Sequence, residues 1–294
     1  MKIVFIGTVE FSRITLEKLY SFHKDIVGIC TLKESNFNSD FSDLSIFGNS
    51  KNIPCKYVND INSTETLQWI KEKSPDVIFC FGWSRLLKEE LLNLPPLGVI
   101  GYHPAALPLN RGRHPLIWAL VLGLDKTAST FFFMDDRADN GDILSQREIL
   151  ILEDDDASSL YKKIVEAALV QIEEFVPQLI AKNFPRLKQN HKLSNTWRKR
   201  GIADGKIDWR MSAKSIHNLV RGLTRPYVGA HFTFQGSEIK VWKTEVVKCK
   251  NRNIEPGKVI NEGSHKHPII KCGEDSISLI IIEPSLKIEK GTYL

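Results

Sequence analysis

The sequence has few of the features that mark an exported or membrane-spanning chain. Its 294 residues include no apolar run of about 18 residues, the minimum for a membrane-spanning helix. The N-terminus leads directly into a strand pattern, without the apolar h-region that is typical of a signal peptide. The 5 cysteines are odd in number and form no C-x-x-C pair, so neither a disulfide framework nor a metal site is predicted. We therefore expect a cytoplasmic protein with reduced thiols, no membrane association and no bound metal.

A dinucleotide-binding fingerprint is also missing. Residues 2–7 form an apolar run that ends in a glycine, but the turn over residues 7–12 contains Gly7 as its only glycine. The G-x-G-x-x-G pattern needs its further glycines because they let a pyrophosphate approach the backbone closely. A nicotinamide cofactor is therefore not expected.

Charge of one sign is not in large excess. The chain has 40 Lys and Arg against 35 Asp and Glu, a net charge of +5, whereas dedicated nucleic-acid-binding proteins concentrate far more positive charge. Residues 32–52, predicted as a surface loop, carry two lysines against three acidic residues: Lys33 and Lys51 against Glu34, Asp40 and Asp43. Such a loop is poor in the cations that binding to tRNA requires, while the overall balance suits a phosphorylated small substrate.

The order of the apolar patterns predicts a doubly wound, Rossmann-like α/β domain with a mainly parallel sheet. A strand over residues 2–7, a helix capped by Ser12 and a strand over residues 25–31 form a right-handed βαβ unit. Ser63 is the predicted N-cap of another helix. Further strands are predicted at residues 54–57, 76–81, 98–103, 129–134 and 143–152, and helices at residues 63–73, 84–91, 114–124 and 156–181.

The C-terminal third has a different pattern. Helical periodicity fails after residue 183, and residues 197–201 form a basic cluster, which indicates a linker. A helix at residues 212–221 is followed by short strands, which are typical of a small OB-like β-barrel. These strands are predicted at residues 230–234, 238–247, 258–260, 269–272 and 276–282. The predicted domains are residues 1–183 for catalysis, 184–205 as the linker and 206–294 as the OB-like β domain.

The most informative stretch is residues 98–115, where an apolar strand ends at His103 and turns at a His-Pro corner. Open α/β sheets place their chemistry at the carboxyl ends of their strands, so we expect the imidazole of His103 there. A carboxylate, Asp139, follows in a second segment, on a turn that contains Gly141. These two segments together predict an active site.

These residues resemble the motifs of the folate-dependent formyltransferases, which move a formyl group from 10-formyltetrahydrofolate to an amine. The resembling segments are His103-Pro-Ala-Ala-Leu-Pro108 and Asp139-Asn-Gly141, and residues 206–209, 216–221 and 226–230 are similar to the C-terminal domain that many members of that family share. The family motif begins Asn-x-His, whereas this chain has Gly101 in place of the asparagine.

The resemblance implies an acid-base pair. Formyl transfer needs a donor that faces the developing oxyanion and a route for the proton that the amine loses. We expect His103 to donate and Asp139 to orient it and relay the proton. Gly101 cannot supply the amide of the missing asparagine, so Asn110, Asn140 or a bound water must replace it. If none of these replaces the asparagine, the alternative is a catalytically inert protein.

The resemblance also implies which residues face each substrate. On the folate side these are Phe81, Gly82, Trp83, Leu107, Asp139 and Gly141, although residues 81–83 also fit a plain strand-to-helix turn. On the acceptor side they are Gly7, Thr8, Phe11, Tyr102, Arg111 and Arg113.

The expected acceptor is the amine of a nucleotide-linked 3-amino or 4-amino deoxysugar, carried by UDP or dTDP, for surface glycan biosynthesis. Arg111 and Arg113, or the cluster Arg198 to Arg200, could bind its diphosphate. One alternative is formylation of methionyl-tRNA. Another is an RNA-binding protein that stacks bases on Phe232, Phe234 and Trp242. The assembly state, with a homodimer among the alternatives, stays open.

Overall fold

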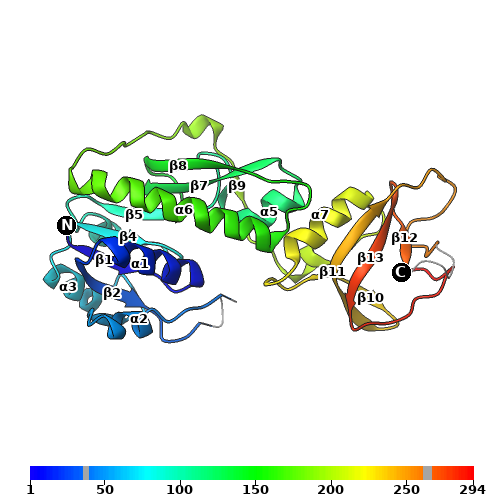
Figure 1. Ribbon diagram of the computed structural model, residues 1–294, viewed down its shortest axis with the longest axis horizontal. Helices are drawn as coiled ribbons and strands as arrows, with labels where there is room; N and C mark the ends of the chain where they lie inside the picture. Colours follow the sequence, from blue (N-terminus) through cyan, green and yellow to red (C-terminus); the bar gives the residue numbers. More distant parts are fainter. Residues whose placement is uncertain (36–39, 261–266) are drawn as a thin grey trace. The chain divides into compact units, whose positions relative to one another are not determined.

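The computed structural model describes residues 1–35, 40–260 and 267–294 (Figure 1). Over these residues, seven strands form one sheet in the order β3-β2-β1-β4-β5-β7-β8. The strands from β3 through β5 pair in parallel, and β7 pairs antiparallel with β5. Their bounds are Ile3–Ile6 (β1), Ile26–Thr31 (β2), Cys55–Tyr57 (β3), Val77–Cys80 (β4), Val99–His103 (β5), Lys126–Phe133 (β7) and Ile143–Leu150 (β8). The predicted Rossmann-like, mainly parallel α/β fold is confirmed.

The central strands are apolar on both faces because helices cover the sheet. Every residue of β1 and β4 is buried, as expected for strands inside a parallel sheet. The ring of Phe79 on β4 lies 6.0 Å from that of Phe175 on helix α6 (Ala157–Ile180), so this helix packs on the sheet. The other helices of the N-terminal half are α1 (Glu10–Phe22), α2 (Ser45–Ser50), α3 (Thr64–Glu72), α4 (Glu89–Leu92) and α5 (Pro115–Val121), and α6 spans Ala157–Ile180.

One predicted helix cap is confirmed and another is wrong. The hydroxyl of Ser63 accepts from the amide of Thr66 at the start of α3. Helix α1 instead begins at Glu10, so Ser12 lies inside its first turn rather than at its N-cap. The Ser12 hydroxyl donates to Phe81 O at 2.6 Å and therefore joins α1 to the end of β4. A helix was predicted at residues 84–91, but residues 84–88 are not helical and only the short α4 forms there.

The chain divides into two compact units. The first comprises Met1–Pro115, Thr127–Ile149 and Lys163–Trp197, and the second comprises Leu116–Lys126, Leu150–Lys162 and Arg198–Leu294. Residues 184–197 were predicted as part of the linker, but they group with the first unit. The domain boundaries at residues 183 and 205 stay a prediction.

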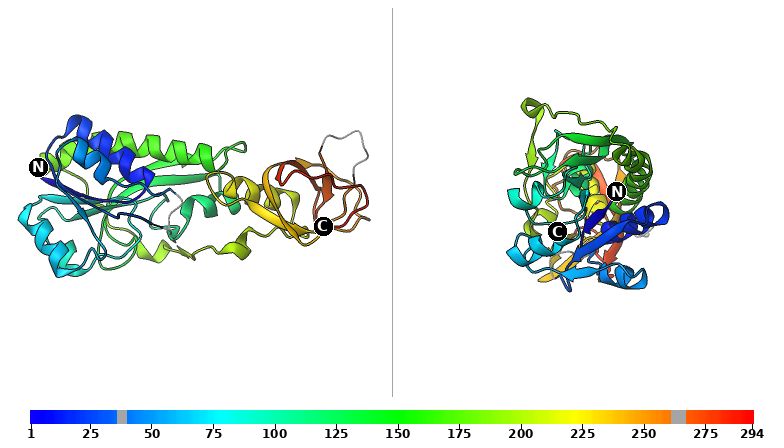
Figure 2. Two further views of the ribbon diagram at one scale, coloured as in Figure 1. Left: turned by 90° about the horizontal axis from the view of Figure 1, so that it is seen from below. Right: turned by 90° about the vertical axis from the view of Figure 1, so that its left-hand side faces the viewer.

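The second unit is built on a four-stranded antiparallel sheet in the order β10-β11-β13-β12, orange to red in Figures 1 and 2. The strands are Ala230–Phe234 (β10), Ser237–Val247 (β11), Ile269–Lys271 (β12) and Ser276–Glu283 (β13), and helix α7 is Ala213–Leu223. Apolar residues of α7 and the sheet share one core, in which Trp209 and Phe232 meet edge to face at 5.4 Å. The predicted small β domain is confirmed.

The structure bears on binding to nucleic acid and on membrane spanning. Phe232 is only 2% exposed and lies in the core, so it cannot stack on a nucleic-acid base. No helix among the residues with described positions is long and apolar enough to span a membrane.

Candidate active site

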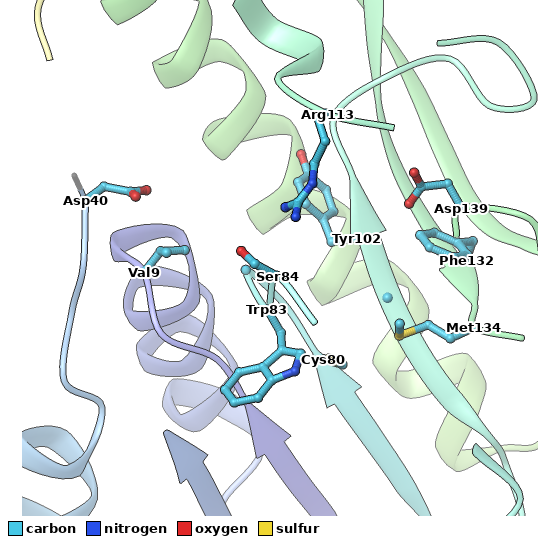
Figure 3. Close-up of a pocket in the computed structure, with 12 residues that line it drawn as sticks. Val9, Asp40, Cys80, Trp83, Ser84, Tyr102, Arg113, Phe132, Met134 and Asp139 are labelled. Atoms are coloured by element: carbon cyan, nitrogen blue, oxygen red, sulfur yellow. The ribbon is translucent and has the colours of Figure 1, made fainter. Parts of the chain in front are cut away.

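A cavity of about 300 Å³ lies at the carboxyl ends of β4 and β5, within the first unit (Figure 3). This is the edge where the sequence placed the chemistry. Five of the predicted site residues line the cavity: Gly82, Trp83, Tyr102, Arg113 and Asp139. The remaining lining residues are Val9, Asp40, Cys80, Ser84, Gly101, Phe132 and Met134.

His103 and Asp139 come together as the sequence predicted. Nδ1 of His103 lies 3.6 Å from Oδ1 of Asp139, and Nε2 donates to Asn110 O at 2.8 Å. A carbonyl oxygen only accepts, so Nε2 carries a proton and Nδ1 faces the carboxylate. A second proton on Nδ1 makes an imidazolium ion paired with Asp139. The carboxylate of Asp139 therefore faces Nδ1 and orients the imidazole of His103.

The two members of this pair differ in their access to the cavity. Asp139 lines it, whereas His103 is 5% exposed and lies behind it. The Asp139 carboxylate is held from the other side, because its Oδ2 accepts from the amide of Gly112 at 2.9 Å. The carboxylate is consequently the member of the pair that a bound substrate can touch.

The two arginines predicted for the acceptor have different environments. Arg113 lines the cavity and points into it in Figure 3. Arg111 is 9% exposed, and its guanidinium donates to Asn140 Oδ1 at 3.2 Å and to Gln189 Oε1 at 2.6 Å. Buried and bonded in this way, Arg111 is part of the framework and is not placed to bind a diphosphate.

The basic cluster at residues 198–200 is also engaged internally. Arg198 pairs with Asp204, and Arg200 donates to Asp204 O at 2.6 Å while its guanidinium lies 4.5 Å from the ring centre of Trp118. All of these residues belong to the second unit. These contacts therefore stabilise a turn of the second unit.

The space beside Gly101 is filled by apolar side chains. A Cβ atom at residue 101 would lie 2.8 Å from Met134 Cγ and 3.1 Å from Phe132 Cζ. Of the expected substitutes for the missing asparagine, Asn140 is 6% exposed, and its amide already donates to Asp135 Oδ2 and accepts from Arg111. Asn140 is therefore not free to act as the oxyanion donor.

The other predicted site residues do not line the cavity but pack against the residues that do, or against the core next to them. Phe81 is fully buried and packs 5.5 Å from the ring of Phe5, and Leu107 packs with Phe132 and Ile143. On the acceptor side, Thr8 donates to Gly82 O at 3.0 Å and the ring of Phe11 stacks 4.2 Å from Tyr102.

Two glycines in this set are required by close packing. A Cβ at Gly7 would lie 2.5 Å from Ser12 Cβ, and one at Gly141 would lie 1.7 Å from Phe133 O. Both positions therefore exclude any larger residue, whatever else the site requires.

Sequence reasoning missed some lining residues because their signal lies in strand register. Cys80 pairs with Gly101, and Gly101 pairs with Phe132, so the three residues form one row across β4, β5 and β7. Cys80 was expected only to be one of the reduced thiols, and burial raises the pKa of this thiol. Val9, Asp40 and Ser84 lie outside the helices and strands, where periodicity carries no information.

The fold and the site together are those of a group-transferring enzyme, with a proton-carrying pair beneath a cavity at the carboxyl edge of an α/β sheet. The family model for formyl transferase matches residues 1–174, and the model for the formyl transferase C-terminal domain matches residues 202–291. The chain belongs to the formyl transferase family. It is a formyltransferase, of a family that uses formyl-tetrahydrofolate.

Two relatives align with nearly the whole of this chain. The chain is 33% identical over 301 residues to a methionyl-tRNA formyltransferase from Caldanaerobacter subterraneus subsp. tengcongensis, an alignment that covers 100% of this chain and 96% of that protein. It is 30% identical over 282 residues to the bifunctional polymyxin resistance protein ArnA from Wigglesworthia glossinidia brevipalpis, covering 95% of this chain and 42% of that protein.

Solved structures share the whole fold. An N-formyltransferase from Helicobacter canadensis, solved with folinic acid and dTDP-3-aminofucose, has a TM-score of 0.70 at 16% identity, covering 95% of this chain and 98% of that chain. WlaRD, a sugar 3N-formyl transferase solved with dTDP and 5-N-formyl-THF, has a TM-score of 0.71 at 20% identity, covering 97% and 99%. At these identities the likeness establishes the fold alone.

Proposed function

We propose that this enzyme transfers the formyl group of 10-formyltetrahydrofolate to the amine of a nucleotide-linked 3-amino or 4-amino deoxysugar. The observation that carries the proposal is the charge around the cavity, where the lining residues include one cation, Arg113, and one further anion, Asp40, besides Asp139. A single cation suits a compact diphosphate, whereas a tRNA acceptor stem is held by many. Two structures with the same fold were solved with dTDP or a dTDP-linked amino sugar, which supports this choice.

The cavity fits the reactive end of a folate. About 300 Å³ is at the lower end of small-molecule sites, and its lining combines three aromatic rings with three charged side chains. Nε1 of Trp83 is buried and has no hydrogen-bond partner among the described residues, so a ligand acceptor there would satisfy it. We assign Gly82, Trp83 and Asp139 to the folate, with Phe81, Leu107 and Gly141 supporting them. The folate supplies the formyl group.

His103 and Asp139 form the proposed catalytic pair. Because Asp139 is the member that reaches the cavity, we assign it to take the proton that the acceptor amine loses as its nitrogen bonds to the formyl carbon. The bond between that carbon and the folate nitrogen then breaks, and Asp139 returns the proton to the folate nitrogen. His103 orients the Asp139 carboxylate, because Nδ1 of the imidazole lies 3.6 Å from Oδ1. The acceptor side is formed by Tyr102 and Arg113 in the cavity, with Gly7, Thr8 and Phe11 behind them.

The remaining assignments complete the proposal. We assign residues 1–183 to the catalytic domain, 184–205 to the linker and 206–294 to the β domain. Linker residues up to Trp197 pack with the first unit. Methionyl-tRNA formylation is the second candidate, which the 33% identity to an enzyme of that name favours.

One assay separates these functions. The enzyme is incubated with 10-formyltetrahydrofolate and, in parallel, with UDP-linked and dTDP-linked 3-amino and 4-amino deoxysugars and with methionyl-tRNA, and the products are measured by mass spectrometry. We expect one formylated sugar nucleotide and no formylmethionyl-tRNA above a blank without enzyme. Formylation of the tRNA with no sugar product would replace the proposal by the second candidate.

A further inference from the structure

The turn that carries Asp139 is held by a side chain from a segment about 50 residues further along the sequence. The amide nitrogen of Gln189 donates to Asp139 O at 3.0 Å and to Gly141 O at 2.7 Å. Gln189 is 6% exposed, in a stretch whose neighbours are exposed. A single buried amide thus bonds to backbone carbonyls on both sides of the turn.

The other end of this amide is fixed as well. Gln189 Oε1 accepts from Arg111 at 2.6 Å, and the same guanidinium nitrogen lies 3.0 Å from Nδ1 of His191. Because Arg111 can only donate, it sets the orientation of the Gln189 amide and directs the NH₂ group to the two carbonyls. The orientation of Gln189 therefore follows from its partners.

The segment around Gln189 is itself joined to the loop that follows His103. Strand β9 (Thr196–Trp197) pairs in parallel with β6 (Arg111–Gly112), and the amide of Asn110 donates to Asn195 Oδ1 at 2.8 Å. Leu187 makes a two-way backbone bridge with Ile143, at the other end of the Asp139 segment. These bonds place Gln189 within the first unit as part of the site's framework.

Asp139 needs such support because its backbone conformation is unusual. Its φ is +55°, a left-handed conformation that few residues other than glycine adopt, and surrounding bonds must maintain it. The Gly112 amide holds the carboxylate, and Gln189 holds the two carbonyls of the turn. Together they fix the distance between the carboxylate and His103.

We propose that Gln189 is a positioning residue for formyl transfer, which acts by holding the turn that presents the Asp139 carboxylate. The inference rests on the role of Asp139 in the proposed function. Gln189 does not line the cavity and so does not touch substrate. Its loss should therefore lower kcat and leave KM for both substrates nearly unchanged.

The test is a double-mutant cycle with Asp139→Asn. Gln189→Met removes both donated hydrogen bonds at similar volume, and Gln189→Glu keeps an acceptor for Arg111 while losing the same donors. Lys188→Met, at an exposed neighbouring residue, is the matched control. Each variant is checked for its melting temperature before kcat and KM are measured, and Gln189→Glu serves if Gln189→Met does not fold.

We expect either Gln189 variant to lower kcat by about 10-fold or more, with KM changed by less than about 3-fold, and Lys188→Met to match the wild type. In the Asp139→Asn background the same change should cost less than about 2-fold, because residues that act as a unit are not additive. An equal loss of kcat in both backgrounds would show a merely structural role and overturn the inference. Wild-type turnover in Asp139→Asn would instead overturn the proposed role of Asp139, and with it this one.

Discussion

The cavity has two linings that are held in different ways. The polar lining, Tyr102, Arg113 and Asp139, is held by directed hydrogen bonds, such as those from Gly112 to Asp139 and between Tyr102 and Ser129. The apolar lining, Cys80, Gly101, Phe132 and Met134, is held by strand register and packing. Loss of one donor should therefore damage the first, while added volume should damage the second.

The largest effect is expected at the proposed catalytic pair, in which Asp139 belongs to the polar lining and His103 lies behind it. We expect His103→Ala and Asp139→Ala each to lower kcat for formyl transfer by about 100-fold or more, the usual scale for an acid-base group. Circular dichroism and melting curves check that the fold survives, and steady-state assays give the rate. Activity near that of the wild type in either variant would contradict the assignment.

The second prediction concerns volume in the apolar lining. Gly101→Asn places a Cβ atom within 2.8 Å of Met134 Cγ, so we expect the side chains to shift and kcat to fall by about 10-fold. Met134→Ala alone should have a smaller effect, and the double variant should recover part of the loss because the clash is relieved. Faster turnover in Gly101→Asn with unchanged folate affinity would show that the lining tolerates an amide donor.

The third prediction tests which arginine meets the acceptor. Arg113→Ala should raise KM for the sugar nucleotide by about 10-fold and leave KM for the folate unchanged, because it removes the one cation in the cavity lining. Arg111→Ala should lower the melting temperature instead, because it leaves Gln189 and Asn140 without their buried partner. A selective rise in the sugar-nucleotide KM for Arg111→Ala would reverse these assignments.

The sequence predicts the catalytic pair of the site but not the bonds that hold its framework. His103 and Asp139 were found because motif residues at strand ends meet at one edge of a sheet, and the α/β order of the first unit follows from apolar periodicity. The bonds made by Gln189 were not predicted, because residues 184–205 have no periodicity and so were assigned to a linker. Arg111 was misjudged for a related reason, since composition shows a cation but not the buried partners that engage it.

The smallest effect is expected at Cys80, in the apolar lining. Its side chain lies in the row that Gly101 and Phe132 continue, it is 5% exposed, and burial raises the pKa of its thiol. A protonated, buried thiol reacts poorly with alkylating reagents because the thiolate is the nucleophile. N-ethylmaleimide should therefore leave Cys80 unmodified in the native enzyme, as peptide mass mapping would show, and Cys80→Ala should change kcat by less than about 2-fold. Rapid alkylation at Cys80 with loss of activity, prevented by bound folate, would show that this lining opens to solvent and that register and packing alone do not hold it closed.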